Sequence, residues 1–280
     1  MADKELKSEI ERMAGGARAV AVAYHDYETG TSAGFQGDRW FHAASTIKIP
    51  VLLGVFGAIE SGMLTLDARV HVRNRFFSAA DGSPYRVEAS RDAGSEVQSY
   101  VGRTMKVRHL AKQMIVTSSN LATNLLVDLI GLDRLTETLE ELGVEGIELH
   151  RGVEDEAAFA QGLNNRVTAR GLVRVLRAIE EETISKESSR EMLEIMHAQE
   201  FRAGIPSGLP DEARVANKTG EISTVAHDAG LVYLPGRKPY AVAILTEWDA
   251  TNTTGRRDVL SDLSRAVYLE LTSDERGDDA

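Results

Sequence analysis

The sequence predicts an α/β (α+β) protein, with an antiparallel sheet flanked by N- and C-terminal helices and an all-α inserted domain. Three observations predict this fold class. Apolar and small residues alternate in residues 17–35 and again in residues 213–248, which is the period of β-strands. The chain between these two segments has mostly helical spacing, and both chain ends also carry helical patterns. A sheet whose strands come from both ends of the chain accounts for this order.

The first part of the chain predicts a helix followed by two strands. Residues 3–14 carry apolar residues at helical spacing, and two glycines follow them. Val20, Val22 and Tyr24 alternate with small residues, which predicts a strand. The Thr-Gly turn after this strand leads into a second strand at residues 31–35.

The middle of the chain is predicted to be mostly helical. A long apolar helix begins at Ser45. Leucines or methionines recur at helical spacing in five further segments. Three of these are residues 105–116, 117–130 and 132–142. The other two are helices that Thr168 and Ser185 are expected to cap. Two polar stretches, residues 74–102 and 152–165, are predicted to be loops, and a loop as long as the first is often functional.

The last third of the chain returns to the period of strands. Strands are predicted at residues 213–220, 225–234 and 240–248. A final amphipathic helix is predicted at residues 254–271.

These elements suggest two domains whose chain segments are interleaved. Residues 1–40 and 206–280 are expected to form the α/β domain, and residues 41–205 the mostly helical domain. Pockets form where domains meet, so the active site is expected at their junction.

Composition excludes several classes of function. The chain has 280 residues, with 43 acidic and 32 basic side chains and a net charge of −11. This balance and the absence of a Lys/Arg-rich run argue against a nucleic-acid partner. No apolar run reaches the length of a membrane span. Without cysteine, and with no metal-ligand spacing among the seven histidines, no metal site or cofactor is expected.

The first residues contain no apolar signal region, so the chain as given is expected in the cytoplasm. A periplasmic or secreted location is expected instead if a leader has been removed. A monomer is expected.

Ser45 and Lys48 lie one helical turn apart, where the long apolar helix begins. A serine hydroxyl becomes a nucleophile when a base lies within hydrogen-bond reach and the local field tolerates an alkoxide. A lysine on the same face and a helix N-terminus meet both conditions. The alternative for this pair alone is a helix-capping serine followed by a surface lysine.

Further polar residues are predicted to share the cleft with this pair. Ser118 lies at a helix–helix junction and Lys218 on a late strand. Acyl transfer needs a nucleophile, a proton shuttle, oxyanion donors and an anchor for substrate charge. Ser118 can relay a proton to a leaving nitrogen, while Lys218 and Thr219 can hold a carboxylate. A second cation nearby would lower the pKa of Lys48 and so allow it to act as the base.

The segments STIK at residues 45–48, SSN at 118–120 and KTG at 218–220 each occur once, in this order. They resemble the three motifs of the penicillin-recognising serine hydrolases, and their surroundings resemble class A β-lactamases over nearly the whole chain. The resemblance implies the β-lactamase/transpeptidase-like fold and a small substrate that bears a carboxylate.

The resemblance also implies a role for each motif residue. Ser45 would be the acylated nucleophile, Lys48 its base or proton shuttle, and Ser118 the proton relay. Asn120 would donate to the amide side chain of the substrate. The remaining roles fall on one strand: Lys218, Thr219 and Gly220 would form the carboxylate site, and the backbone of Glu221 would complete the oxyanion hole with that of Ser45.

Two positions depart from the class A pattern. Ser119 stands where class A enzymes usually have aspartate, which is expected to change support of the site and not its chemistry. The glutamate that activates the deacylating water has no clear counterpart, because no acid lies three residues before Leu163-Asn164. Glu154 and Glu156 are the candidates, and solvated surface acids are the alternative for each.

Two histidines lie near the motifs. His227, on the strand after KTG, is interpreted as a packing or hydrogen-bonding residue. His42 lies three positions before Ser45 and is expected close to the site.

The predicted function is hydrolysis of β-lactam amide bonds through a Ser45 acyl-enzyme. An esterase or a D-alanyl peptidase with the same nucleophile is the first alternative. The second is a β-lactam-binding module that is acylated without efficient turnover.

Overall fold

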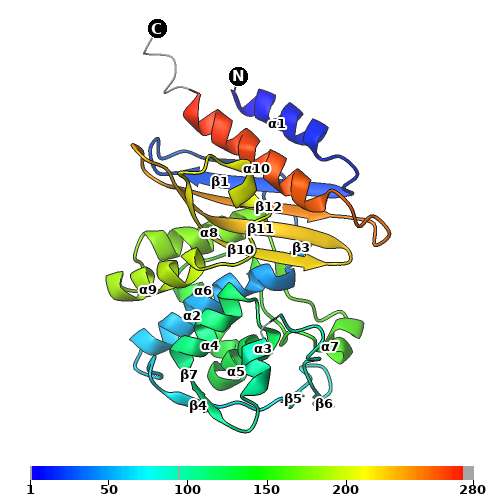
Figure 1. Ribbon diagram of the computed structural model, residues 1–280, viewed down its shortest axis with the longest axis vertical. Helices are drawn as coiled ribbons and strands as arrows, with labels where there is room; N and C mark the ends of the chain where they lie inside the picture. The colour runs from blue at the N-terminus through cyan, green and yellow to red at the C-terminus, as the bar shows by residue number, and fades with distance from the viewer. Residues whose placement is uncertain (1, 94, 274–280) are drawn as a thin grey trace.

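The centre of the molecule is a five-stranded antiparallel sheet with the strand order β10-β11-β12-β1-β2 (Figure 1). This computed structural model describes residues 2–93 and 95–273. The strands of the sheet are β1 (Ala19–Asp26), β2 (Ser32–Phe35), β10 (Arg214–Ile222), β11 (Val225–Tyr233) and β12 (Tyr240–Glu247). Two of them come from the start of the chain and three from its end, so the predicted fold class is confirmed.

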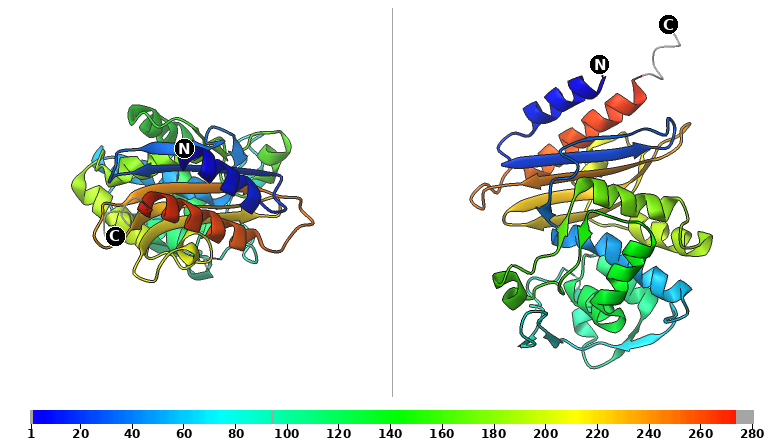
Figure 2. Two further views of the ribbon diagram at one scale, coloured as in Figure 1. Left: turned by 90° about the horizontal axis from the view of Figure 1, so that it is seen from above. Right: turned by 180° about the vertical axis from the view of Figure 1, so that it is seen from behind.

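Helices cover both faces of the sheet (Figures 1 and 2). One face carries α1 (Ala2–Met13) and α10 (Arg256–Thr272). The other carries α8 (Ala169–Glu180) and α9 (Lys186–His197). The first and last helices therefore lie on the same side of the sheet, remote from the helical half of the molecule.

The residue sizes along β1 explain why two layers of helices fit. Because alternate side chains of a strand point to opposite faces, Ala21 and Ala23 join the core on the α8 side, while Val20 and Val22 join the core on the α10 side. Small residues let α8 approach closely, and the larger ones fill the space under α10.

Below the sheet, helix α2 (Lys48–Glu60) is the central element of the helical half (Figure 1). Ten of its 13 residues are buried, as expected for a helix that is apolar on all sides. The helices around it are α4 (Val107–Val116), α5 (Asn120–Ile130) and α6 (Leu132–Glu141). At Gly54 a Cβ atom would lie 2.4 Å from Leu135 Cδ2, so a larger residue would require the Leu135 side chain to move.

The helix starts and stops predicted from sequence are largely present. The hydroxyl of Thr168 accepts the backbone N–H of Gly171, and that of Ser185 accepts the N–H of Ser188, so both predicted caps are confirmed. Gly131 ends α5 with a φ of 89°, a conformation that favours glycine.

The two predicted loops contain more regular structure than expected. The first, residues 74–102, holds short elements that have no period long enough to detect: β5 (Phe76–Phe77), β6 (Pro84–Tyr85) and α3 (Ser95–Ser99). The second holds α7 (Glu156–Ala160). The other short elements are β3 (Phe41–His42), η1 (Ala44–Ile47), β4 (Arg69–His71), β7 (Thr104–Lys106), β8 (Ile147–Glu148), β9 (Arg166–Val167) and η2 (Ile205–Gly208).

The division into two domains at these boundaries stays a prediction. Helices α8 and α9, which were assigned to the helical domain, pack on the sheet as well as on α2. Within residues 2–93 and 95–273, no helix has the length and apolarity of a membrane span.

Candidate active site

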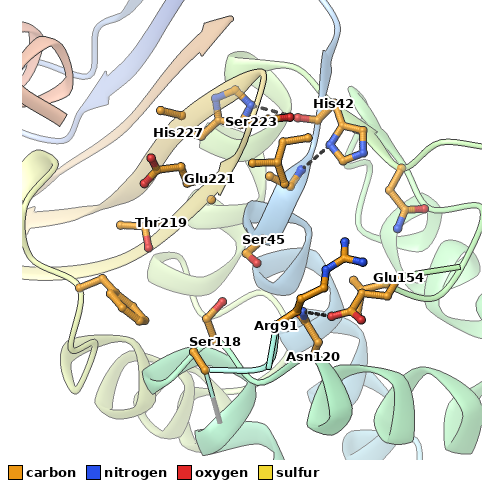
Figure 3. Close-up of a pocket in the computed structure, with 18 of the residues that line it drawn as sticks. His42, Ser45, Arg91, Ser118, Asn120, Glu154, Thr219, Glu221, Ser223 and His227 are labelled. Atoms are coloured by element: carbon orange, nitrogen blue, oxygen red, sulfur yellow. Dashed lines mark hydrogen bonds between the residues drawn. The ribbon is translucent and has the colours of Figure 1, made fainter. Parts of the chain in front are cut away.

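A cleft of about 1020 Å³ lies where the sheet meets the helical half of the molecule (Figure 3). Its walls combine residues that are far apart in the sequence. Ser45, Ser118 and Asn120 come from helix starts of the helical half, while Thr219 and Gly220 come from the edge strand β10. The structure thus brings the three sequence motifs to one place.

Ser45 lies inside the 3₁₀ turn η1 and not at a capping position, since the N-terminal cap of η1 is Ala43. The capping alternative is therefore wrong. The preceding residue, Ala44, has a φ of 44°, a strained conformation for alanine. In the described part of the chain no hydrogen bond engages Ser45 Oγ, as is common before a substrate tightens the geometry of a site.

Lys48 is fully buried, which contradicts the surface-lysine alternative. Its Nζ donates to the backbone oxygen of Ser118 at 2.7 Å, to Ser118 Oγ at 3.1 Å and to Asn120 Oδ1 at 2.7 Å. Burial is the main reason that its pKa lies well below the usual range, and the charge of Lys218 lowers it further. The negative charges of Asp92 and Glu154 oppose this shift, but the pKa of Lys48 remains lowered.

The second lysine, Lys218, is also fully buried, and its Nζ donates to the backbone oxygen of Thr219 at 2.7 Å. Burial lowers its pKa to about 7, against the opposing charge of Asp228. Thr219 and Gly220 line the cleft, and Lys218 lies behind them. Its role as a carboxylate anchor stays a prediction.

Gly220 is required by the close approach of β10 to the Ser45 turn. A Cβ atom at this position would lie 2.9 Å from the backbone nitrogens of Ser45 and Thr46. The next residue, Glu221, lines the cleft, and its exposed carboxylate accepts from Arg257 at 3.0 Å. The predicted oxyanion pair, the backbone of Ser45 and Glu221, therefore lies on two adjoining segments.

The middle residue of the second motif, Ser119, caps α5 by accepting the N–H of Ala122. A carboxylate is nevertheless present beside it, because Asp92 reaches in from the long polar loop. Its Oδ1 accepts the N–H of Asn120 at 2.8 Å, and its Oδ2 accepts the N–H of Leu121 and the hydroxyl of Ser119, both at 3.3 Å. This buried aspartate supports the start of α5 where the motif itself lacks one.

The two candidate deacylation residues have different surroundings. Glu154 Oε1 accepts from Asn120 Nδ2 at 2.6 Å, and its Oε2 accepts the N–H of Glu88 at 3.0 Å. Figure 3 shows its carboxylate facing Asn120, on the Ser45 side of the cleft. The Glu156 carboxylate is exposed at the rim and pairs with Arg91 at 2.9 Å. The geometry favours Glu154, which is linked through Asn120 to Lys48.

Backbone strain is concentrated at this cleft. Five non-glycine residues of the described chain have a positive φ, and three of them, Ala44, Ser118 and Glu154, line the cleft. Each such residue costs about 1–3 kcal/mol, which only a well-packed surrounding sustains. The clustering marks the cleft as a candidate functional site.

His227 has the structural role that was predicted for it. Its Nε2 donates to the backbone oxygen of His42 at 2.9 Å, and its Nδ1 accepts the N–H of Thr246 at 3.1 Å. Burial lowers its pKa to about 4, so the ring is neutral and joins β11 to the segment before Ser45. His42 lines the cleft, as expected, and its Nδ1 accepts the N–H of Ala44 at 3.0 Å.

Sequence reasoning missed two charged residues of this site. Asp92 lies in a polar loop among several other acids, and nothing in its spacing singles it out. Arg151 lines the cleft as a buried cation, although arginine in a loop is usually exposed. Among the described residues no group of three or more histidine, aspartate or glutamate side chains is arranged to bind a metal ion.

Comparison with known proteins identifies a protein family that matches this chain. A family model described as the beta-lactamase enzyme family matches residues 3–271. A β-lactamase from Bacteroides uniformis is 25% identical over 278 residues, which cover 94% of this chain and 90% of that protein.

Solved structures with the same fold include a class A β-lactamase and an acyl-enzyme complex with penicillin G. An ancestral class A β-lactamase superposes with a TM-score of 0.81 at 25% identity, over 96% of this chain and 99% of that one. A mutant of PBP-A, solved as an acyl-enzyme complex with penicillin G, superposes with a TM-score of 0.79 at 26% identity, over 97% and 96% of the two chains.

Proposed function

Because the chain belongs to the beta-lactamase enzyme family, we propose that it hydrolyses β-lactam amides as a serine hydrolase of the class A type, with Ser45 as the nucleophile. The observation that supports this most strongly is the state of Lys48. It is a buried amine with a lowered pKa, one helical turn from Ser45, and hydrogen bonds to Ser118 and Asn120 fix its position. A lysine in that state accepts a proton from a serine.

Acylation then follows from the contacts around Lys48. Lys48 removes the proton of Ser45 Oγ as this oxygen attacks the lactam carbonyl. The backbone N–H groups at Ser45 and Glu221 stabilise the oxyanion. When the carbon–nitrogen bond breaks, the proton passes from Lys48 to Ser118 Oγ, 3.1 Å away, and on to the leaving nitrogen. The product is an ester of Ser45.

Deacylation requires a base for water, and we assign it to Glu154. Each carboxylate oxygen of Glu154 accepts one hydrogen bond, from Asn120 or from the Glu88 backbone, and keeps a further lone pair. A water that donates to this carboxylate on the Ser45 side loses its proton as it attacks the ester. As the ester carbon–oxygen bond breaks, the proton held by Glu154 returns to Ser45 Oγ, which restores the hydroxyl, and the acid product leaves.

Turnover of a chromogenic cephalosporin tests the proposal. The purified protein is expected to open the lactam ring, and Ser45→Ala is expected to abolish that activity. Ser207→Ala, an exposed serine outside the cleft, is the matched control and should leave the rate unchanged. An unchanged rate in Ser45→Ala would refute Ser45 as the nucleophile.

The likeness to the PBP-A acyl-enzyme supports a second candidate, a penicillin acceptor that releases its acyl group slowly. Mass spectrometry of the protein mixed with a penicillin separates the two. A mass increase that disappears within minutes indicates a β-lactamase, and one that persists for hours indicates an acceptor. Ester hydrolysis measured beside the cephalosporin tests the esterase alternative. The monomeric state and the compartment stay predictions.

A further inference from the structure

Arg151 is a buried cation with too few partners. It is 6% exposed, and its guanidinium makes one hydrogen bond to an acceptor in the described chain, from Nη1 to the Gly152 backbone oxygen at 3.0 Å. Its buried Nε has no partner, and the one polar contact of its Nη2 among the described residues is with a histidine ring nitrogen. Leaving a buried charged donor unpaired is costly, so such a group indicates a missing acceptor.

The neighbour of Arg151 does not supply that acceptor. Arg151 Nη2 lies 3.5 Å from His42 Nε2. Since His42 Nδ1 accepts the N–H of Ala44, the neutral ring carries its hydrogen on Nε2. Burial and the charge of Arg151 lower the pKa of His42 to about 4, so this neutral form is present at pH 7. Two N–H donors therefore face one another across this short distance.

No carboxylate of the described residues lies within ion-pair distance of Arg151. The carboxylate of Asp155, whose charge acts on Arg151, has both oxygens engaged by backbone N–H groups, those of Ala79 and Ala158. The charge of Arg151 is thus compensated only from a distance.

The two donors face the substrate cleft. His42 and Arg151 both line it, and the half-exposed ring of Phe159 packs against both, with its centroid 5.6 Å from the guanidinium carbon. In Figure 3, His42 lies on one side of Ser45 and Thr219 on the other. A substrate whose ring carboxylate lies near Thr219 would therefore extend its acyl side chain towards His42.

We propose that His42 Nε2 and the Arg151 guanidinium form an anion subsite that binds a carboxylate on the acyl side chain of the substrate. The inference rests on the proposed function, because it places the acyl group on Ser45. One carboxylate oxygen accepts from both His42 and Arg151 Nη2, and the Phe159 ring covers the methylene groups that precede it. The protein therefore selects substrates with two carboxylates, one at each end of the cleft.

The test compares two penicillins that differ only at the end of the acyl side chain, one with a carboxylate and the other with the carboxamide. Acylation of Ser45 is followed by mass spectrometry, and the ratio of the two second-order rate constants is measured. A ratio of about tenfold or more in favour of the carboxylate is expected, as for a charged hydrogen-bond pair. In Arg151→Gln the ratio should fall to about one or below.

Arg166→Gln is the matched control, because Arg166 is exposed, pairs with Glu148 and lies outside the cleft. It removes the same charge and should keep the wild-type ratio. If Arg151→Gln does not fold, Arg151→Lys, which lacks the guanidinium fork, should also lower the ratio. A wild-type ratio of one or less overturns the subsite without any variant. Equal acylation by both penicillins leaves the proposed function intact, whereas no acylation by either refutes it.

Discussion

At the scale of single residues, the chemistry depends on two buried lysines whose surroundings differ. Burial lowers the pKa of both. The positive charge of Lys218 lowers the pKa of Lys48 further, whereas the buried carboxyl of Asp228 raises that of Lys218 against the effect of burial. One lysine is thus prepared to accept a proton, and the other holds one below about pH 7.

The pKa of about 7 for Lys218 predicts an alkaline limb in the pH profile of kcat/KM. Below this pH the ammonium attracts the substrate carboxylate, and above it the charge is lost, so kcat/KM should fall as the pH rises through about 7. In Lys218→Arg the cation persists at all accessible pH values, so the limb should move to higher pH. Steady-state rates between pH 5 and 10 measure this; an identical limb in the variant would contradict it.

Removal of the Glu154 carboxylate should separate acylation from deacylation. In Glu154→Gln the amide cannot take a proton from water, so we expect the acyl-enzyme to accumulate and its hydrolysis to slow by about 10²–10⁴-fold. Acylation should change much less, because Lys48 and Ser118 keep their contacts. Time-resolved mass spectrometry with penicillin G measures both steps.

Glu156→Gln is the matched control for this experiment. Glu156 lies two positions away and carries the same charge, but it is exposed and paired with Arg91 at the rim. Its variant should keep deacylation within about threefold of the wild type, since surface ion pairs contribute little. Slower deacylation in Glu156→Gln than in Glu154→Gln would reverse the assignment.

At the scale of elements, the start of α5 determines where Ser118 and Asn120 lie. The carboxylate of Asp92 binds two backbone N–H groups there, those of Asn120 and Leu121. We expect Asp92→Asn to weaken this cap by about 1 kcal/mol and to slow acylation of Ser45 by about 10- to 100-fold, because small displacements of catalytic groups are costly. Thermal unfolding and the acylation rate give the two values.

A second substitution tests whether the position of the carboxylate matters. Ser119→Asp restores an acid at the middle of the second motif, where class A enzymes usually carry it. In the Asp92→Asn background it should recover a large part of the acylation rate, and in the wild type it should bring two acids together and slow the reaction. Failure of the double variant to recover would show that Asp92 acts only on the loop.

The elements also differ in whether they could be predicted from the sequence. Strands and long helices have a clear period, and the caps Thr168 and Ser185 follow from side-chain chemistry, so these elements were predicted correctly. The elements α3, α7 and β5 are two to five residues long and have no period to detect. Asp92, Arg151 and the choice of Glu154 over Glu156 depend on how loops pack together, which no local pattern records.

At the scale of the whole molecule, one buried ion pair connects strand β1, the turn between β11 and β12, and helix α10. Asp26 at the end of β1 is fully buried and pairs with Arg237 in the hairpin between β11 and β12. Arg237 Nη1 also donates to the Leu271 backbone oxygen of α10 at 2.9 Å. Strands from both chain ends and the last helix thus meet at a single side chain, away from the cleft.

Loss of this side chain should therefore affect stability without affecting chemistry. Arg237→Met leaves the Asp26 charge buried without a cation, although Glu28 and Thr29 still donate to it, so we expect the free energy of unfolding, measured in urea, to fall by about 3 kcal/mol. Acylation of Ser45 by penicillin, measured where the variant is folded, should match the wild type. Arg18→Met is the control: its pair with Asp249 is more than half exposed and should contribute about 0–1 kcal/mol. Equal losses in the two variants would show that burial of the Asp26–Arg237 pair does not set its contribution.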